Sequence, residues 1–380
     1  MARAAAGNNA GRGGCVGRGM LRGASVLALI AVLLAGARLV AAPLDELQFF
    51  RIGTAATTGT YFQIGGVLAS ALSRAPGTRD CEHGGSCGVS GLVAVAQATQ
   101  GSVQNVAAVS GGQLEAALAQ SDITYWAYIG ASPASHRCAG GKEDASIRNT
   151  GAGAFKGKPL KNLRAIASLY PEDVHVVVRA ESPIRSLREL KGKRVALGEP
   201  ESGTLADARL VLEAAGLNEC EMKAEYLRLP EAADALTQGR IDAFFMVSGY
   251  PVPAITDVAA TVPTRLLPIA PEVIDRLIRK FSFMGADTIP GGSYPNIDEA
   301  TPTVSTKALF IVREDVKDDL VHAITKALWS DSTRRLLETA HPAGKRIKLA
   351  NAFEGVAIPF HPGAARFYRE AGMKLPADTQ

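Results

Sequence analysis

Small and hydroxyl-bearing residues fill one loop that is suited to holding an anion, Gly53-Thr54-Ala55-Ala56-Thr57-Thr58-Gly59-Thr60-Tyr61. The loop follows an apolar strand predicted at 48–52 and precedes an amphipathic helix predicted at 61–73. Backbone N–H groups at a helix start lack partners and carry the positive end of the helix dipole. The segment therefore predicts an anion cradle with Thr54, Thr58 and Tyr61 as ligand contacts, although Tyr61 equally fits the buried face of the helix.

Two later segments have the same arrangement of a small-residue loop before a predicted helix. Residues 100–105 open a second helix, and residues 201–205 follow a strand predicted at 194–197 and open a third. Each loop alone also fits an ordinary αβ connection, but the three together favour a small acid held between two lobes. Ser121, between a predicted helix and strand, either binds a ligand amine or caps the chain locally. The candidate contacts from these segments are Ser102, Asn105, Ser121, Ser202, Gly203 and Thr204.

The sequence lacks the common catalytic motifs. It contains no His-Glu-x-x-His, no Gly-x-Ser-x-Gly and no nucleotide-phosphate loop. Its histidines are scattered, and His341 and His361 each precede a proline, which favours a turn or capping role. Arg179 and Arg209 fit either a ligand carboxylate or structural ion pairs. We therefore predict a binding protein with no catalytic residue, no cofactor and no metal, rather than an enzyme.

The N-terminal 42 residues have the pattern of a secretory signal. They contain five arginines and no acid, then the apolar run 24–37 and small residues. An uncleaved anchor is the alternative, although the run is short and rich in alanine. The pattern predicts export to the periplasm with residues 1–42 removed.

The basic pI of the whole chain, about 8.8, comes from this leader. Five of the 41 basic residues lie in it, which leaves 36 basic against 37 acidic residues in the remainder. The remainder has no basic stripe and no zinc-finger spacing, so we predict no nucleic-acid partner.

Export permits disulfide bonds. Cys81 and Cys87 lie in a polar, glycine-rich segment in which they can meet, and we predict that they are linked. A metal site made by Cys81, His83 and Cys87 is the alternative, although this spacing matches no common zinc pattern. Cys138 and Cys220 are either a long-range pair or two separate thiols.

Strands alternate with helices from residue 47 to about 129, which predicts a mostly parallel sheet. Residues 133–157 are polar and glycine-rich, and we interpret them as a surface loop. The predicted strands are 48–52, 92–97 and 123–128, and the predicted helices are 61–73, 103–110 and a short one at 114–119.

A second αβ unit follows. Two strands predicted at 164–169 and 174–178 are split by Tyr170-Pro171-Glu172-Asp173. A helix predicted at 204–215 starts with a capping box of Thr204 and Asp207. Further strands are predicted at 225–229, 241–247 and 307–312, and further helices at 231–237, 271–280, near 320–328 and at 362–371.

The two units and the return of the chain predict a bilobal α/β binding protein. We assign 1–42 to a signal peptide, 43–175 to the first lobe and 176–305 to the second. Residues 306–380 form a C-terminal segment that returns to pack on the first lobe and the hinge. The crossovers are expected near 169–178 and 303–310, and one continuous sheet through both units would contradict this division.

The chain resembles the TAXI family, the extracytoplasmic solute-binding receptors of one class of TRAP transporter. The resemblance covers nearly all of residues 47–372, and the ordered set of motifs makes it specific. The Cys81–Cys87 segment is also similar to a feature of one branch of that family. The motifs are Ile52-Gly-Thr-Ala-Ala-Thr-Thr-Gly-Thr-Tyr61-Phe62, Gly101-Ser-Val-Gln-Asn105, Gln120-Ser-Asp122, Asp242-Ala-Phe-Phe245, Ile289-Pro-Gly-Gly-Ser-Tyr294-Pro295, Pro302-Thr-Val-Ser-Thr-Lys-Ala-Leu309, His341-Pro-Ala-Gly-Lys-Arg346 and Ile358-Pro-Phe-His-Pro-Gly363.

The resemblance implies a type II periplasmic-binding-protein fold, two αβ lobes joined by hinge strands. It also implies a monomeric receptor that binds a small carboxylate, either a glutamate-like amino acid or a dicarboxylate, and delivers it to an ion-driven TRAP permease. The alternative is a periplasmic enzyme on the same fold, acting on a small carboxylated substrate. The first family loop usually has more glycine than Ala55, Ala56 and Thr57 provide here. We expect Ser102→Ala and Ser202→Ala each to weaken binding and to leave the stability of the unliganded protein nearly unchanged.

Overall fold

The computed structural model describes residues 47–83, 85–131 and 155–377. The predicted signal peptide and nearly all of the loop predicted at 133–157 lie outside these ranges. Cys138 also lies outside them. Cys220 is disulfide-bonded, so the alternative of two separate thiols is wrong. Within the described ranges, no helix is both long and apolar enough to cross a membrane.

The first part of the chain forms one end of the sheet. Strand β1 (Gln48–Gly53) pairs in parallel with β4 (Leu92–Gln97) and with β5 (Ala116–Gln120). Helix α2 (Thr60–Leu72) follows β1, α3 (Ser102–Ser110) follows β4, and α4 (Ser121–Ile129) follows β5. The predictions for β1, β4, α2 and α3 are confirmed to within two residues.

The prediction exchanged a helix and a strand between residues 114 and 129. The predicted helix at 114–119 is strand β5, and the predicted strand at 123–128 is helix α4. Every residue of β5 is buried, so its alanine-rich sequence shows no alternation that would distinguish a strand from a helix. In α4 the aromatic and β-branched residues suggested a strand, but Ile123, Trp126 and Ala127 are buried at helical spacing.

The second part of the chain forms the other end of the sheet, in the strand order β6-β9-β7-β8. Its helices follow the predicted αβ alternation, although α8 was not predicted. The strands are β7 (Arg194–Ala196), β8 (Lys223–Glu225), β9 (Ala243–Ser248) and β10 (Thr264–Leu266), and the helices are α6 (Gly203–Ala214), α7 (Leu229–Thr237), α8 (Pro253–Thr261) and α9 (Pro271–Lys280).

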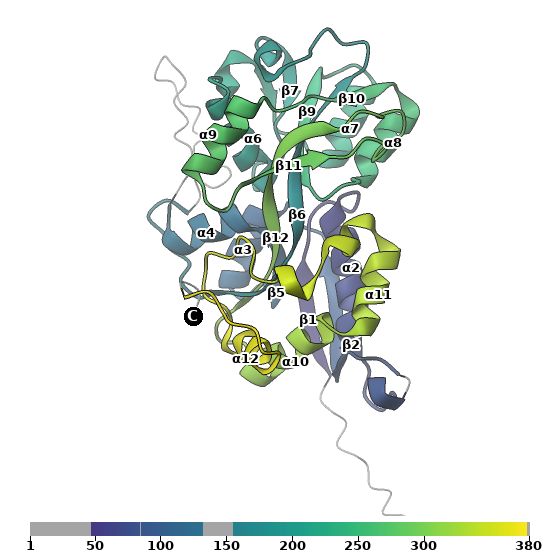
Figure 1. The fold of residues 1–380 in the computed structure, drawn as a ribbon, viewed down its shortest axis with the longest axis vertical. Helices are drawn as coiled ribbons and strands as arrows, with labels where there is room; N and C mark the ends of the chain where they lie inside the picture. The colour runs from purple at the N-terminus through teal and green to yellow at the C-terminus, as the bar shows by residue number, and fades with distance from the viewer. Residues whose placement is uncertain (1–46, 84, 132–154, 378–380) are drawn as a thin grey trace, which may run out of the picture. The chain divides into compact units, whose positions relative to one another are not determined.

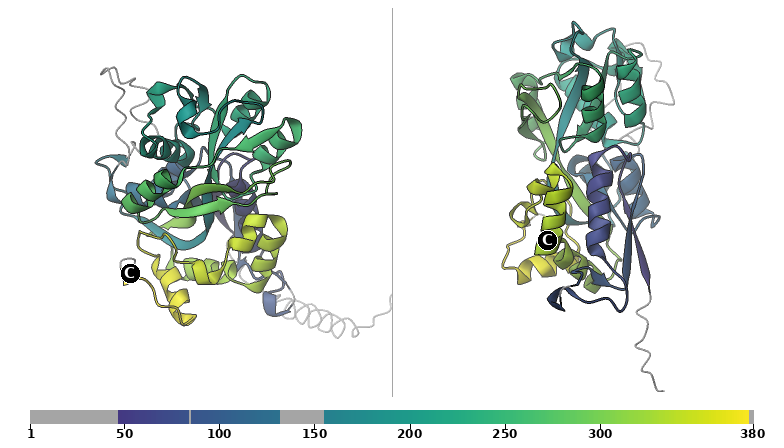
Figure 2. Two further views of the ribbon diagram at one scale, coloured as in Figure 1. Left: turned by 45° about the horizontal axis from the view of Figure 1, so that its top comes forward. Right: turned by 90° about the vertical axis from the view of Figure 1, so that its right-hand side faces the viewer.

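Two long strands join the two ends of the sheet. Strand β6 (Leu163–Arg179) and strand β12 (Thr301–Arg313) pair antiparallel between residues 163–173 and 305–313, and β11 (Gly285–Ile289) pairs with the first part of β12. In Figure 1 they run through the middle of the molecule, with α6–α9 around their upper ends and α2, α3 and α4 around their lower ends. Figure 2 shows the same two groups of elements from two further sides.

Hydrogen bonding is therefore continuous through both units, and the expectation that no single sheet runs through both of them is wrong. The predicted break at Tyr170-Pro171-Glu172-Asp173 does not interrupt β6. The register shifts beside Tyr170 and Ser168, where Leu169 has no partner, and Pro171 sits next to this bulge opposite Lys307. A bulge is where a sheet tolerates proline. The lobe limits 43–175, 176–305 and 306–380 remain a prediction.

The last part of the chain returns to the first helices. Helices α10 (Asp318–Leu328) and α11 (Asp331–Ala340) pack against α2, and α12 (Pro362–Glu370) packs against α10. Backbone bonds from Ala165 N to Pro359 O and from His361 N to Ala165 O attach this segment to β6. Helix α11 was not predicted.

A small polar subdomain carries the predicted disulfide. Strands β2 (Ser73–Arg74) and β3 (Val89–Ser90) pair in parallel, and the segment between them contains the Cys81–Cys87 bond. The disulfide prediction is confirmed, and the alternative of a metal site at these two cysteines is wrong because their sulfurs are bonded to each other.

Candidate binding site

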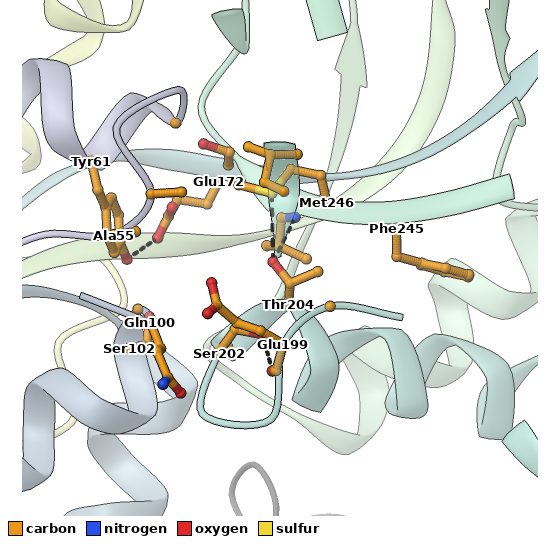
Figure 3. A pocket seen from close by; sticks show the side chains of 18 of the residues that line it. Ala55, Tyr61, Gln100, Ser102, Glu172, Glu199, Ser202, Thr204, Phe245 and Met246 are labelled. Atoms are coloured by element: carbon orange, nitrogen blue, oxygen red, sulfur yellow. Dashed lines mark hydrogen bonds between the residues drawn. The ribbon is translucent and has the colours of Figure 1, made fainter. Parts of the chain in front are cut away.

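A pocket lies where the starts of α2, α3 and α6 meet residues of β6 and β9 (Figure 3). It encloses about 620 Å³, including the space at its opening to solvent. The lining residues are Ala55, Ala56, Gly59, Thr60, Tyr61, Gln100, Gly101, Ser102, Gln120, Glu172, Gly198, Glu199, Ser202, Gly203, Thr204, Leu227, Leu229, Ala232, Phe245, Met246, Val247 and Ser248.

At two of the helix starts a glycine stands at the N-cap, so no side chain accepts a hydrogen bond from the first backbone N–H groups. Helix α2 begins after Gly59 and α3 after Gly101, and neither start has a side-chain cap. Gly101 has a φ of 109°, which glycine adopts without strain. In α3, Gln104 N already donates to Glu201 O at 3.2 Å. The first-turn N–H groups available to a bound anion are therefore those of α2 and those of Ser102 and Val103 in α3.

Five of the nine predicted contacts line the pocket, namely Tyr61, Ser102, Ser202, Gly203 and Thr204. Their hydroxyl groups, however, already have partners in the protein. Ser102 Oγ accepts from Gln120 N at 3.1 Å and donates to Gln120 Oε1 at 3.2 Å. Thr204 Oγ1 accepts from Val247 N at 3.2 Å. The backbone at these positions is thus better placed for a ligand than the hydroxyls are.

The other four predicted contacts are not among the lining residues, and three of them make bonds that shape the surrounding loops. Thr54 Oγ1 donates to Gln97 O at 2.7 Å. Asn105 Nδ2 donates to Thr54 O at 2.6 Å and to Leu118 O at 2.7 Å. Ser121 Oγ lies 2.8 Å from Thr306 Oγ1. The side-chain oxygen of Thr58 is buried and has no hydrogen-bond partner among the described residues.

Helix α6 is capped differently from the prediction. Ser202, not Thr204, is the N-cap, and its Oγ accepts from Leu205 N at 3.1 Å. Asp207 does not complete a capping box, because its carboxyl is buried and accepts a bond of 2.7 Å from Gln120 Nε2. Asp207 and the neighbouring Asp122 are both buried, and burial raises the pKa of both carboxyl groups.

We therefore expect Ser202→Ala to lower the free energy of unfolding by about 1 kcal/mol, the usual cost of losing an N-cap hydroxyl. This replaces the expectation of unchanged stability. Denaturant titration of the unliganded protein measures it, and Ser202→Thr, which retains a hydroxyl, should recover most of the loss. A Ser202→Ala protein as stable as the wild type would contradict the capping role.

Glu172 lies in the middle of β6 and was not predicted as a site residue. Tyr61 OH donates to Glu172 Oε2 at 2.5 Å, so Tyr61 contributes both a buried ring and a polar contact. Burial raises the pKa of the Glu172 carboxyl well above its usual range, although the bond from Tyr61 opposes this. The sequence does contain a signal for this residue, because Glu172 and Asp173 are adjacent acids inside an otherwise apolar strand. Burying acids costs free energy, so a buried pair indicates a structural or functional role.

Glu199 was also missed, although it lies two residues before the predicted motif at 201–205. Its side chain points into the pocket (Figure 3). Arg228 Nε lies 3.8 Å from Glu199 Oε2. Burial raises the pKa of Glu199 to about 7, and the Arg228 charge only partly offsets this.

The pocket therefore has two chemically distinct sides. Uncapped helix starts offer N–H groups to an anion, whereas Glu172 and Glu199 offer carboxyl oxygens. No Lys, Arg or His occurs among the lining residues of the described chain. The described residues also include no group of three or more His, Cys, Asp or Glu side chains placed to hold a metal ion.

The sequence pattern of the NMT1-like family matches residues 52–139 and 144–372. The match spans most of the chain, and the protein belongs to the NMT1-like family.

Solved structures similar to this chain include three binding proteins. The periplasmic aliphatic sulphonate binding protein SsuA from Escherichia coli is 16% identical, with 87% of this chain and 96% of that chain covered and a TM-score of 0.43. The alkanesulfonate-binding protein SsuA from Xanthomonas axonopodis pv. citri, bound to MOPS, is 15% identical, with 88% and 96% covered and a TM-score of 0.43. A periplasmic substrate-binding protein of an ABC transporter from Coxiella burnetii is 17% identical, with 78% and 98% covered and a TM-score of 0.39.

Proposed function

We propose that the protein is an exported, monomeric solute-binding receptor that captures a small carboxylate in this pocket and delivers it to a membrane permease. The resemblance to the TAXI family favours a TRAP permease driven by an ion gradient. The leader pattern at 1–42 supports a periplasmic location.

One observation carries the proposal: helix starts from distant parts of the sequence converge on one pocket. The α2 and α3 starts belong to the first unit, and the α6 start belongs to the second. A carboxylate placed there accepts backbone N–H bonds from more than one helix and lies at their positive ends. Binding between the two units also suits capture by closure and release by opening.

A periplasmic enzyme on the same fold is the second candidate. Glu172, Glu199 and Tyr61 are the polar side chains in the pocket that titrate, and acids with raised pKa values occur in catalytic sites. None of the lining serines or threonines has a histidine beside it in the described pocket. We favour the receptor, because the pocket offers contacts for holding a ligand without a paired nucleophile and base.

A thermal-shift screen of the mature protein with amino acids, 2-oxo acids and dicarboxylates tests the proposal. A ligand present at a hundred times its Kd should add about 2.7 kcal/mol to the free energy of unfolding. A hit should be recovered unchanged after prolonged incubation, whereas conversion to a product would favour the enzyme. If no carboxylate stabilises the protein, the receptor proposal is wrong.

A further inference from the structure

We propose that the pocket selects a ligand carrying an ammonium group and an apolar side chain beside its carboxylate, with Glu199 and Glu172 as the ammonium acceptors. The ligand class is a zwitterionic, apolar amino acid rather than a dicarboxylate or a 2-oxo acid. This inference rests on the proposed receptor function and specifies its ligand.

Glu199 has the chemistry of an unoccupied acceptor. Its side chain is only 9% exposed, and it makes no hydrogen bond within the described structure. The Arg228 contact does not satisfy it, since the Nε–Oε2 distance of 3.8 Å is too long for a hydrogen bond and the Arg228 side chain is 55% exposed. A buried carboxyl without a hydrogen bond is costly, and a bound ammonium group would remove that cost.

Glu172 supplies a second acceptor from another element. The residue is 1% exposed and lines the pocket, and its Oε2 is occupied by Tyr61 OH. Its Oε1 has no hydrogen-bond partner in the described chain. Figure 3 shows Glu172 and Glu199 approaching the pocket from opposite sides. An ammonium group has three N–H donors, so it can bond to both acids.

The charge of the pocket argues against a second carboxylate on the ligand. The uncapped starts of α2 and α3 can accommodate one anionic group. A second would face Glu172 or Glu199, with no basic residue among the described lining residues to compensate. Where these acids are ionised, a second carboxylate this close in a buried site is strongly repelled, whereas an ammonium group stabilises their ionised form.

Apolar residues form the remaining wall. Such a surface gives no hydrogen bonds to a polar side chain and favours a hydrocarbon or thioether group. The residues are Leu227, Leu229, Ala232, Phe245 and Met246.

Matched ligand pairs test the inference by calorimetry. The pairs are L-leucine with 4-methyl-2-oxopentanoate and L-glutamate with 2-oxoglutarate. In each pair the amino acid has an ammonium group where the 2-oxo acid has a keto oxygen. We expect L-leucine to bind about ten- to a hundred-fold more tightly than its 2-oxo counterpart, the range for one hydrogen bond to a charged group. In the Glu199→Gln variant the ratio of the affinities for L-leucine and for its 2-oxo counterpart should fall to about three or less. The Glu172→Gln change alone should also lower this ratio.

Glu201→Gln is the matched control, because Glu201 is an exposed acid on the same loop that does not line the pocket. It should leave the ratio unchanged, and melting curves of all three variants verify folding. If 2-oxo acids or dicarboxylates bind as tightly as L-leucine, or if neither glutamate variant changes the ratio, the ammonium assignment is wrong although the receptor function stands. If no probe of any class binds, both proposals fail.

Discussion

Replacing Gly203 with alanine should lower ligand affinity by about a hundred-fold, equivalent to about 3 kcal/mol. A Cβ atom at this position would lie 1.2 Å from Gln120 Oε1 and 3.1 Å from Ser102 Oγ. Gln120 cannot turn away without loss, because its Nε2 donates to Asp207 and its Oε1 accepts from Ser102. The added methyl group would therefore separate the α6 start from the first unit and enlarge the gap that a ligand must bridge.

Gly66→Ala provides the control for this change. Gly66 also lies in a helix, α2, but a Cβ atom there would meet nothing within 4 Å. This variant should bind as tightly as the wild type and gain up to about 1 kcal/mol of stability from helix propensity. Isothermal titration with the ligand found in the screen measures both affinities. Equal affinity in Gly203→Ala and wild type would mean that the α6 start does not approach the ligand.

The sequence identified the helix starts of the site because glycine and hydroxyl residues have local, recognisable preferences there. Gly101 and Ser202 are the N-cap residues of α3 and α6, and Gly203 is the first residue of α6. Serine and glycine are common at helix N-caps. The two acids had no such signal. Glu172 belongs to a strand whose continuation past Pro171 depends on a bulge opposite β12, a segment more than 120 residues later.

The exchange of β5 and α4 has the same origin in long-range contacts. Alanine favours helices in isolation, yet Ala116–Gln120 is a strand because β1 and β12 pair with it on both sides. The roles of polar side chains also depend on distant partners. Asn105 was predicted to bind ligand, and in the structure its amide donates to the carbonyl group of Thr54, directly after β1, and to that of Leu118 in β5, which only the folded sheet brings together.

Asp207→Asn should stabilise the protein increasingly as the pH rises. Asp207 and Asp122 are buried side by side, and their carboxyl groups interact with each other. One oxygen of each, Asp207 Oδ1 and Asp122 Oδ2, has no other partner among the described side chains. Burial, with the nearby charges of Asp122 and Glu172, raises the pKa of Asp207 well above its usual range. The folded protein therefore retains a proton on this pair.

The sign of the pH dependence follows from this retained proton. An aspartate in the unfolded chain has a pKa of about 4, so above pH 4 unfolding releases the proton and the wild type loses about 1.4 kcal/mol of stability per pH unit from this group, until the folded pKa is reached. Asparagine cannot ionise, yet its oxygen can accept from Gln120 Nε2 and its NH₂ can donate to Asp122. The stability difference between Asp207→Asn and wild type should therefore grow between pH 5 and pH 8, as measured by urea titration.

Asp234→Asn, the same change at an exposed aspartate, is the control. Its free energy of unfolding should change with pH in parallel with that of the wild type. If Asp207→Asn is also parallel, the pair is ionised in the folded protein and a cation must offset its charge.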